Sequence, residues 1–230
     1  MGCSQPQIWV YSPENEKVLK FEESIGLGRH RSGYYEGLMS RLGKSENFSK
    51  ALEGFQRFSG IEISGSLEDL LSEYFSTDNQ TNLKAFKCFC ILLSQSPPLE
   101  KGESLWYTFD TTLESFLKSS EIKLMLSYLL TTSIQISISF AQNSSYPDSK
   151  SLSTYQSTLK AHIPTLTLKL LSHFTQSKEF VTKEEFLLRL QDRPEGLICS
   201  TGEIRAQLEL ISKISLKLVS KEIIDIKLID

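Results

Sequence analysis

Two acidic residues, Asp110 and Glu121, enclose a twelve-residue interruption between two amphipathic segments within Lys101–Leu130. Carboxylates and other oxygen-bearing groups are the ligands that hard cations such as Ca²⁺ prefer. Apolar residues at helical spacing predict a helix on each side of the interruption. These residues are Leu105, Trp106 and Phe109 before it, and Ile122, Met125, Leu126 and Leu129 after it. The first chemistry that the sequence suggests is therefore cation binding in a loop between two helices.

This outline resembles the EF-hand superfamily, most of all the neuronal calcium sensor and calcineurin-B-like proteins. An EF-hand loop holds calcium from positions 1, 3, 5, 7, 9 and 12. With Asp110 at position 1, the resemblance also puts Leu117 at position 8, where the family carries an apolar residue that joins paired loops. It implies a weak metal site formed by four side chains and the position-7 carbonyl: Asp110, Thr112, Glu114, Phe116 and Glu121.

Three positions of this loop depart from the family pattern. Ser115 stands where glycine makes the sharp turn, and a left-handed conformation there costs a residue with a Cβ about 1–2 kcal/mol. Lys118 puts a positive charge beside the ion, and Thr112 replaces a carboxylate or amide ligand with a hydroxyl. The sequence therefore predicts no resident cofactor, with a weak calcium site at Asp110–Glu121 as the alternative.

Two further stretches fit the same frame without its ligands. Ser76–Lys87 has serine at position 1 and lysine at position 12. In a helix–loop–helix unit over Leu159–Leu190, Glu185 takes position 12, which places Phe174 at position 1 and Lys178 at position 5. The resemblance implies that neither of these loops chelates a metal.

The helices around these loops are rich in Phe, Leu and Ile although the loops lack metal ligands. We expect a non-catalytic adaptor or regulatory protein that holds an amphipathic helix of a protein partner in an apolar groove. Candidate groove residues, each of which also fits a plain core, are Phe89, Trp106, Met125 and Phe186. The chain also resembles the EF-hand-like helical lobe that precedes TLDc domains.

Two alternatives to the adaptor stay open. One is a calcium sensor that retains the weak site, and the other is an enzyme. For an enzyme we find no Ser-His-Asp arrangement, metal cluster, Walker loop or glycine fingerprint.

The first residues, Met1-Gly2-Cys3-Ser4, resemble the start of dually acylated proteins. Gly2 would carry a myristoyl chain and Cys3 a palmitoyl chain. One myristoyl chain binds a bilayer only marginally, so Cys3 would supply the second anchor. Pro6 departs from the Ser or Thr of the myristoylation consensus. The pattern predicts a peripheral membrane protein on the cytoplasmic side.

Composition narrows the function classes further. The chain has 230 residues, 40% of them hydrophobic, so it can bury a substantial core. Its net charge of −3 and pI of about 5.8 argue against a nucleic-acid partner. The four cysteines show no disulfide framework or zinc spacing. We see no signal peptide and no run of eighteen apolar residues, which favours the cytoplasm.

The expected fold is mainly α, with EF-hand-like paired helix–loop–helix lobes and short β-hairpins as an option at the termini. The segments would be 1–31 (acylation and hairpin), 32–97 (N-terminal lobe), 98–200 (C-terminal lobe) and 201–230 (helix and hairpin). The hairpins are expected at Ile8–Phe21 and around Ser220–Glu222. A mobile polar loop is expected at Gln142–Ser157, and the apolar alternation at Ile134–Phe140 fits either a strand or a helix.

Overall fold

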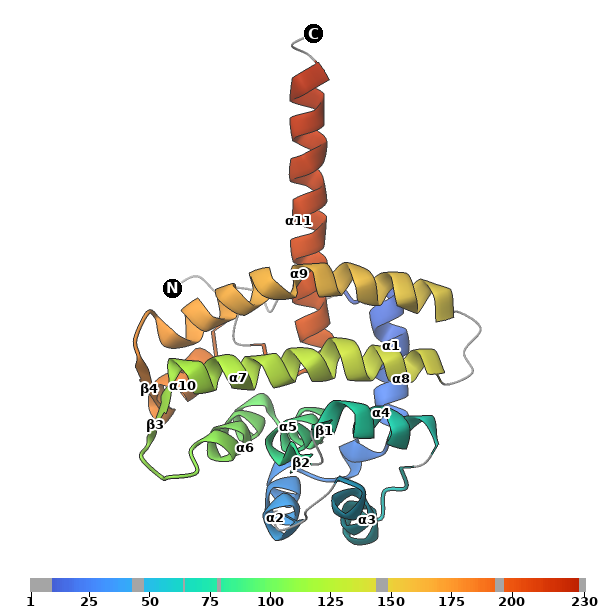
Figure 1. The fold of residues 1–230 in the computed structure, drawn as a ribbon. Coiled ribbons are helices and arrows are strands. Elements are labelled where there is room, and N and C mark those ends of the chain that lie inside the picture. Colours follow the sequence, from blue (N-terminus) through green and yellow to red (C-terminus); the bar gives the residue numbers. More distant parts are fainter. Residues whose placement is uncertain are drawn as a thin grey trace.

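The chain folds as an assembly of helices, which confirms the prediction of a mainly α protein (Figure 1). The structure is a computed structural model that describes residues 10–42, 48–63, 65–77, 80–143, 149–192 and 197–227. Its elements up to residue 93 are α1 (Pro13–Ser24), η1 (Leu27–Arg29), α2 (Ser32–Leu42), α3 (Phe48–Ser59), α4 (Ser66–Phe75), β1 (Ser76–Thr77), β2 (Gln80–Thr81) and α5 (Leu83–Leu93).

The elements after residue 97 are longer on average. They are α6 (Pro98–Phe109), β3 (Phe116–Lys118), α7 (Ser119–Leu130), η2 (Thr131–Ile136), α8 (Ser137–Asn143), α9 (Ser149–Thr175), β4 (Phe180–Thr182), α10 (Lys183–Arg189) and α11 (Thr201–Lys227). In Figure 1, α9 lies along the continuous rod formed by α7, η2 and α8, and the C-terminal part of α11 projects from the rest of the fold.

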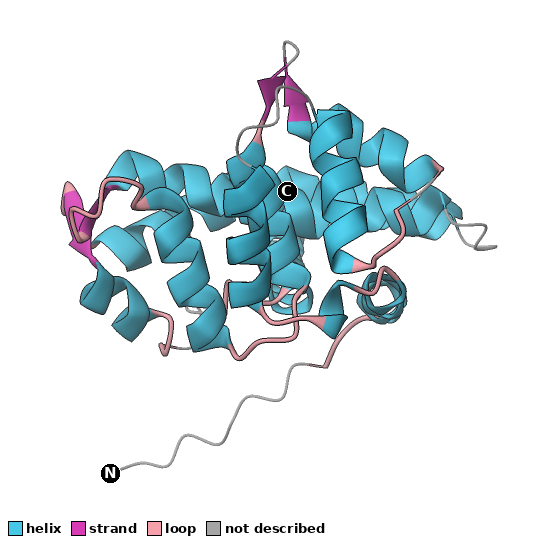
Figure 2. Cartoon of the chain, turned by 90° about the horizontal axis from the view of Figure 1, so that it is seen from below, coloured by secondary structure: helices cyan, strands magenta, loops and turns pink. Residues whose placement is uncertain are grey.

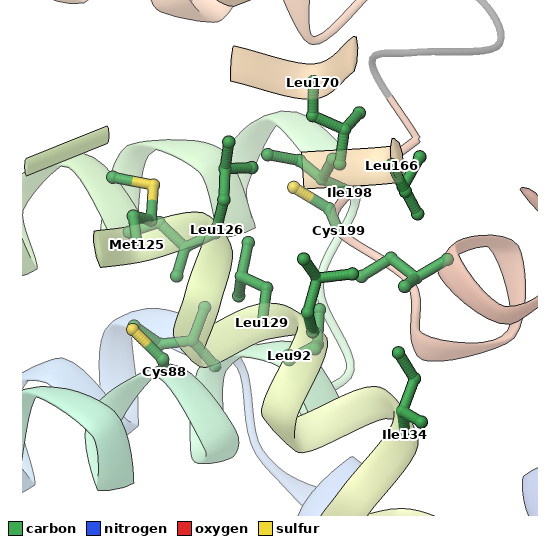
Figure 3. Packing of buried hydrophobic residues seen from close by; sticks show 14 of the residues in the cluster. Cys88, Leu92, Met125, Leu126, Leu129, Ile134, Leu166, Leu170, Ile198 and Cys199 are labelled. Atoms are coloured by element: carbon green, nitrogen blue, oxygen red, sulfur yellow. The ribbon is translucent and has the colours of Figure 1, made fainter. Parts of the chain in front are cut away.

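Two apolar clusters hold these helices together. One is built mainly by α2–α5 and centres on the aromatic rings of Phe48, Phe55, Phe75, Phe86 and Phe89. The other joins α1 and α5 to the helices from α6 to α11, and Figure 3 shows part of its packing. Helix α5 and η2 each contribute to both clusters, so they connect the two halves of the core.

The strands form two antiparallel pairs, β1 with β2 and β3 with β4. Figure 2 shows that the two pairs lie far apart on the molecule. The β1–β2 pair closes a local hairpin, whereas β3 and β4 come from segments more than sixty residues apart.

Both terminal hairpins were wrong predictions. The described part of Ile8–Phe21 enters α1, because Ser12 accepts a hydrogen bond from the backbone N–H of Asn15 (3.1 Å) and Pro13 occupies the first helical position. The C-terminal segment is the long helix α11. Its apparent alternation arises because Ile214 and Leu216 are exposed apolar residues on a helix.

Two loop predictions also need correction. The frame drawn over Ser76–Lys87 is a hairpin followed by a helix, since Asn82 caps α5 by accepting from the N–H of Ala85 (3.1 Å). The polar stretch Gln142–Ser157 is helical at both ends: α8 ends at Asn143 and α9 begins at Ser149. Serine and asparagine mark helix starts as readily as loops, and this ambiguity produced both errors.

The segment Ser119–Asn143 is long and apolar enough to cross a membrane, with a mean hydropathy of 1.4. In the fold, 67% of this apolar window is buried, so packing against other helices accounts for its composition. The alternation at Ile134–Phe140 therefore belongs to a helix whose residues face both apolar clusters.

The six-residue π-helical turn η2 interrupts this rod and disturbs the usual helix hydrogen bonds. Distant side chains bind the carbonyls at the turn. Arg205 donates to the carbonyl of Ser133 (3.0 Å), and the Gln156 amide donates to those of Ile134 (3.1 Å) and Gln135 (3.3 Å). These contacts attach α9 and α11 to the rod.

Arg205, which is fully buried, also ties α11 to α1. Its guanidinium donates to Glu22 (2.8 Å) and to the side-chain oxygen of Asn15 (2.8 Å), and Thr201 donates to the same Glu22 carboxylate (2.6 Å). A buried charge needs such a full set of partners. The network holds the two ends of the described chain together.

Candidate functional site

Two loops lie side by side where β3 pairs with β4. The first loop, Asp110–Glu121, runs from α6 to α7, and the second, Phe174–Glu185, runs from α9 to α10. Leu117 is paired directly with Val181, and both side chains are buried. The residues at position 8 of the two frames therefore meet across a short antiparallel ladder and enter the core together.

The helices that flank the loops pack crosswise. Helix α6 of the first unit contacts α10 of the second, and α7 contacts α9. Gly102 on α6 permits the first contact, because a Cβ at that position would lie 2.1 Å from a methyl carbon of Leu190, which caps the end of α10. At the surface, the Lys183 ammonium donates to the hydroxyl of Tyr107 (2.8 Å) and pairs with Glu103 (3.4 Å).

The first loop makes its turn with hydrogen bonds from its own backbone. The buried Asp110 carboxylate accepts from the N–H groups of Glu114 (3.0 Å) and Ser115 (3.3 Å). Ser115 adopts a φ of 62° and Leu113 a φ of 58°, both left-handed. The turn that glycine makes easily is thus made by serine at a conformational cost.

The other predicted ligands of this loop are directed elsewhere. The Glu121 carboxylate accepts from the backbone N–H of Lys118 (2.8 Å) at the start of α7. Thr112 and Glu114 are exposed, and Phe116 lies in the ladder opposite Thr182. Across the described residues, no group of three or more His, Cys, Asp or Glu side chains is placed to hold a metal ion.

An ion pair between two of its own residues closes the second loop. The Lys178 ammonium, at position 5, pairs with the Glu185 carboxylate, at position 12. Glu185 also accepts from the N–H of Thr182 (3.1 Å), and its own N–H donates to the Thr182 hydroxyl (3.3 Å), which makes a capping box for α10. The hydrogen bond from Lys178 and that from the Thr182 backbone lower the pKa of Glu185.

The two loops are also bonded to each other beside the ladder. The backbone N–H of Ser119 donates to the carbonyl of Glu179 (2.8 Å), and the Ser119 hydroxyl donates to the carbonyl of Lys178. The rings of Phe116 and Phe180 meet edge to face, 5.1 Å apart. One loop therefore fixes the position of the other.

The four residues predicted to line a partner groove do not form one in this structure. Phe89, Trp106, Met125 and Phe186 have no exposed surface. Trp106 and Phe186 pack together with ring centres 5.6 Å apart, whereas Phe89 belongs to the other apolar cluster. The physical reason is that the helices flanking the loops close over Trp106, Met125 and Phe186, whereas Phe89 is enclosed by α2–α5.

Two of the described histidines and the described cysteines pack against other parts of the fold. His30 stacks on Tyr34 (4.2 Å between ring centres), and His173 lies 3.1 Å from the carbonyl of Arg189. Burial raises the pKa of the Cys88 and Cys199 thiols to about 12, so both are protonated at neutral pH. The predicted acylation sites Gly2 and Cys3 lie outside the described residues, and their acylation stays a prediction.

Sequence reasoning missed three elements of this site. The opposite charges of Lys178 and Glu185, at frame positions 5 and 12, were a signal that could have predicted the ion pair. A glycine at 102 on an amphipathic helix could have signalled a close helix contact. Nothing in the sequence points to the role of Ser119.

No protein-family model matches this chain, no curated protein matches it, and no solved structure matches it.

Proposed function

We propose that the chain is an EF-hand-like adaptor whose paired loops hold their shape without calcium. The fold class is supported by the order of elements, helix, loop, short strand and helix, which occurs twice. The position-8 pair Leu117–Val181 and the crosswise packing of α6 on α10 and of α7 on α9 add to this support.

One observation carries the calcium-independent part of the proposal. Each carboxylate at the ends of the two loops already has a hydrogen-bond donor or a cation within this chain as its partner. Asp110 accepts hydrogen bonds from two backbone N–H groups. Glu121 accepts one from the backbone N–H of Lys118, and Glu185 pairs with the Lys178 ammonium. In a sensor, calcium would take these oxygens and change the angle between the helices.

The adaptor role follows from what the site can do chemically. A metal-free loop pair gives the flanking helices a fixed arrangement, and a fixed arrangement presents a constant surface to a partner. Among the described residues, the Cys88 and Cys199 thiols are buried and neutral, and His30 and His173 contact backbone carbonyls. These surroundings favour binding over catalysis. The partner would bind to the outer surface rather than between Trp106 and Phe186.

The alternative, a sensor with one weak site, is favoured by one feature. The first loop keeps Asp110 and Glu121 at both ends, and the left-handed Ser115 reproduces the turn that a chelating loop needs. To bind there, calcium would have to replace the hydrogen bond from the Lys118 backbone N–H to Glu121, and it would lie close to the positive charge of the Lys118 ammonium.

Crosslinking and affinity purification of the full chain from its native cells tests the proposal. We expect the same partner, at the same yield, in a calcium buffer and in a calcium chelator. A partner recovered only with calcium would establish the sensor instead. The predicted membrane anchor is tested separately, by the intact mass of the purified chain and of a Gly2→Ala variant.

A further inference from the structure

A surface notch lies between α2 and the end of α3. Its volume is about 280 Å³. We call it the α2–α3 notch and define it by its lining residues, Gly33, Tyr34, Gly37, Leu38, Arg41 and Phe58.

The floor of the notch is bare helix backbone. Gly33 and Gly37 are one helical turn apart within α2, and a Cβ built on either one would have no heavy atom within 4 Å. Neither glycine has a positive φ, so the fold requires glycine at neither position. Glycine inside a helix costs about 1 kcal/mol relative to alanine. The two glycines therefore leave open space over the backbone of α2.

The walls of the notch are aromatic and partly fixed. Phe58 is 55% exposed and Tyr34 is 39% exposed, although both are large apolar side chains. The Tyr34 hydroxyl donates to the carbonyl of Phe58 (2.7 Å), and its ring stacks on His30. Rigid, exposed aromatic groups of this kind are the usual anchors of protein interfaces.

The charge around the notch is positive on a chain whose net charge is −3. Arg41 lines the notch, and Arg57 is exposed next to Phe58. At the N-terminal end of α2, Arg29 and Arg31 line a second cavity of about 520 Å³. None of the described residues that line these two cavities is acidic. The carboxylates nearby are Glu100, 3.5 Å from Arg31, and Glu36, which directly precedes Gly37 on α2.

We propose that the α2–α3 notch is the docking site of an acidic segment of a protein partner that carries one bulky apolar side chain. The apolar side chain seats on Gly33 and Gly37, between the two aromatic walls. Carboxylates on both sides of it pair with Arg41 at one end and with Arg31 and Arg29 at the other. This inference rests on the proposed adaptor function for the class of partner, but it does not depend on calcium.

Selection from a display library of random sixteen-residue peptides tests the proposal with the full chain as bait. We expect enriched peptides to combine several acidic residues with a central aromatic or large aliphatic residue. Fluorescence anisotropy then compares their affinity for the wild-type chain and for variants. Gly37→Leu fills the notch and should weaken binding about tenfold or more. Arg41→Glu should also weaken it, and added salt should weaken the wild-type complex.

The matched control is Thr165→Leu, which adds the same side chain to an exposed position on α9 and should leave the affinity unchanged. Gly37→Leu should fold, because its site is open and leucine is a better helix former than glycine. Circular dichroism melting checks this.

Three results would overturn the proposal: no enriched peptide, enriched peptides without acidic bias, or peptides that bind Gly37→Leu as tightly as the wild type. In the last case the proposed adaptor function would remain, but the partner would bind to a different surface of the chain. Calcium-dependent partner capture would instead contradict the adaptor function and leave the notch result intact.

Discussion

The loops Asp110–Glu121 and Phe174–Glu185 occupy equivalent places on the two sides of one strand ladder, yet each closes in a different way. The first uses a buried carboxylate that accepts backbone N–H groups, and the second uses an exposed ammonium–carboxylate pair. Either device can hold a turn that a metal ion would otherwise organise. The comparison shows that the polar groups of both loops find partners within the chain beside the buried Leu117–Val181 contact, and we propose that these contacts, rather than calcium, hold the geometry.

Loss of the Leu117–Val181 contact should have the largest effect on the free energy of unfolding. Leu117→Ala removes a buried side chain at the ladder and should lower the free energy of unfolding by about 2–5 kcal/mol. Leu113→Ala, in the same loop at a position 76% exposed, is the matched control and should change it by less than about 0.5 kcal/mol. Urea denaturation measures both, and equal effects would mean that the ladder does not hold the loops.

Asp110→Ala should come next. It leaves the N–H groups of Glu114 and Ser115 without their acceptor, which costs about 1–3 kcal/mol. Asp110→Asn keeps one acceptor oxygen and should cost less. A loss for the asparagine variant as large as that for alanine would show that the charge, and not the turn, is what matters in the first loop.

Lys178→Met should have a smaller effect, because the ion pair that it breaks in the second loop is exposed. The expected loss at pH 7 is small, because solvent screens an exposed ion pair. Since the folded-state pKa of Glu185 is lowered, the pair stabilises the fold above the unfolded-state pKa, and this contribution disappears as the pH falls through the folded-state pKa. Urea denaturation from pH 7 down to pH 3 should therefore show wild type and variant converging in acid. A gap that widens in acid would contradict the assignment.

Ser115→Gly should have the smallest effect, and it should be stabilising. Glycine relieves the left-handed strain at φ 62°, but it also raises the entropy of the unfolded chain. The net gain should stay below about 1 kcal/mol. Thermal unfolding of the variant measures it, and a clear loss of stability would mean that the serine side chain makes a contact that outweighs the strain.

Part of this fold could be predicted from the sequence. The apolar spacing of Leu166, Leu170 and Phe174 gives the entering helix of the second loop, and all three side chains are buried. Thr182 and Glu185 give the capping box that starts α10. These features are local, so periodicity and capping chemistry are sufficient to find them.

The remaining features depend on distant parts of the chain or on ambiguous signals. Ser12 and Pro13 are as typical of a helix start as of a turn, so the sequence alone does not distinguish α1 from a hairpin. The contact of Arg205 with Glu22 joins residues 183 positions apart, and no pattern in one sequence announces it. Gly33 and Gly37 show the right spacing for a bare helix face, but only the packing around α2 reveals that the face is open.

Isothermal titration calorimetry of calcium into the full chain tests the central claim most directly. We expect no saturable heat across the sensor range of about 10⁻⁷–10⁻⁵ M. We also expect Glu121→Gln to give the same flat trace. Saturable binding in that range that Glu121→Gln abolishes would contradict the account and establish the first loop as a working calcium site.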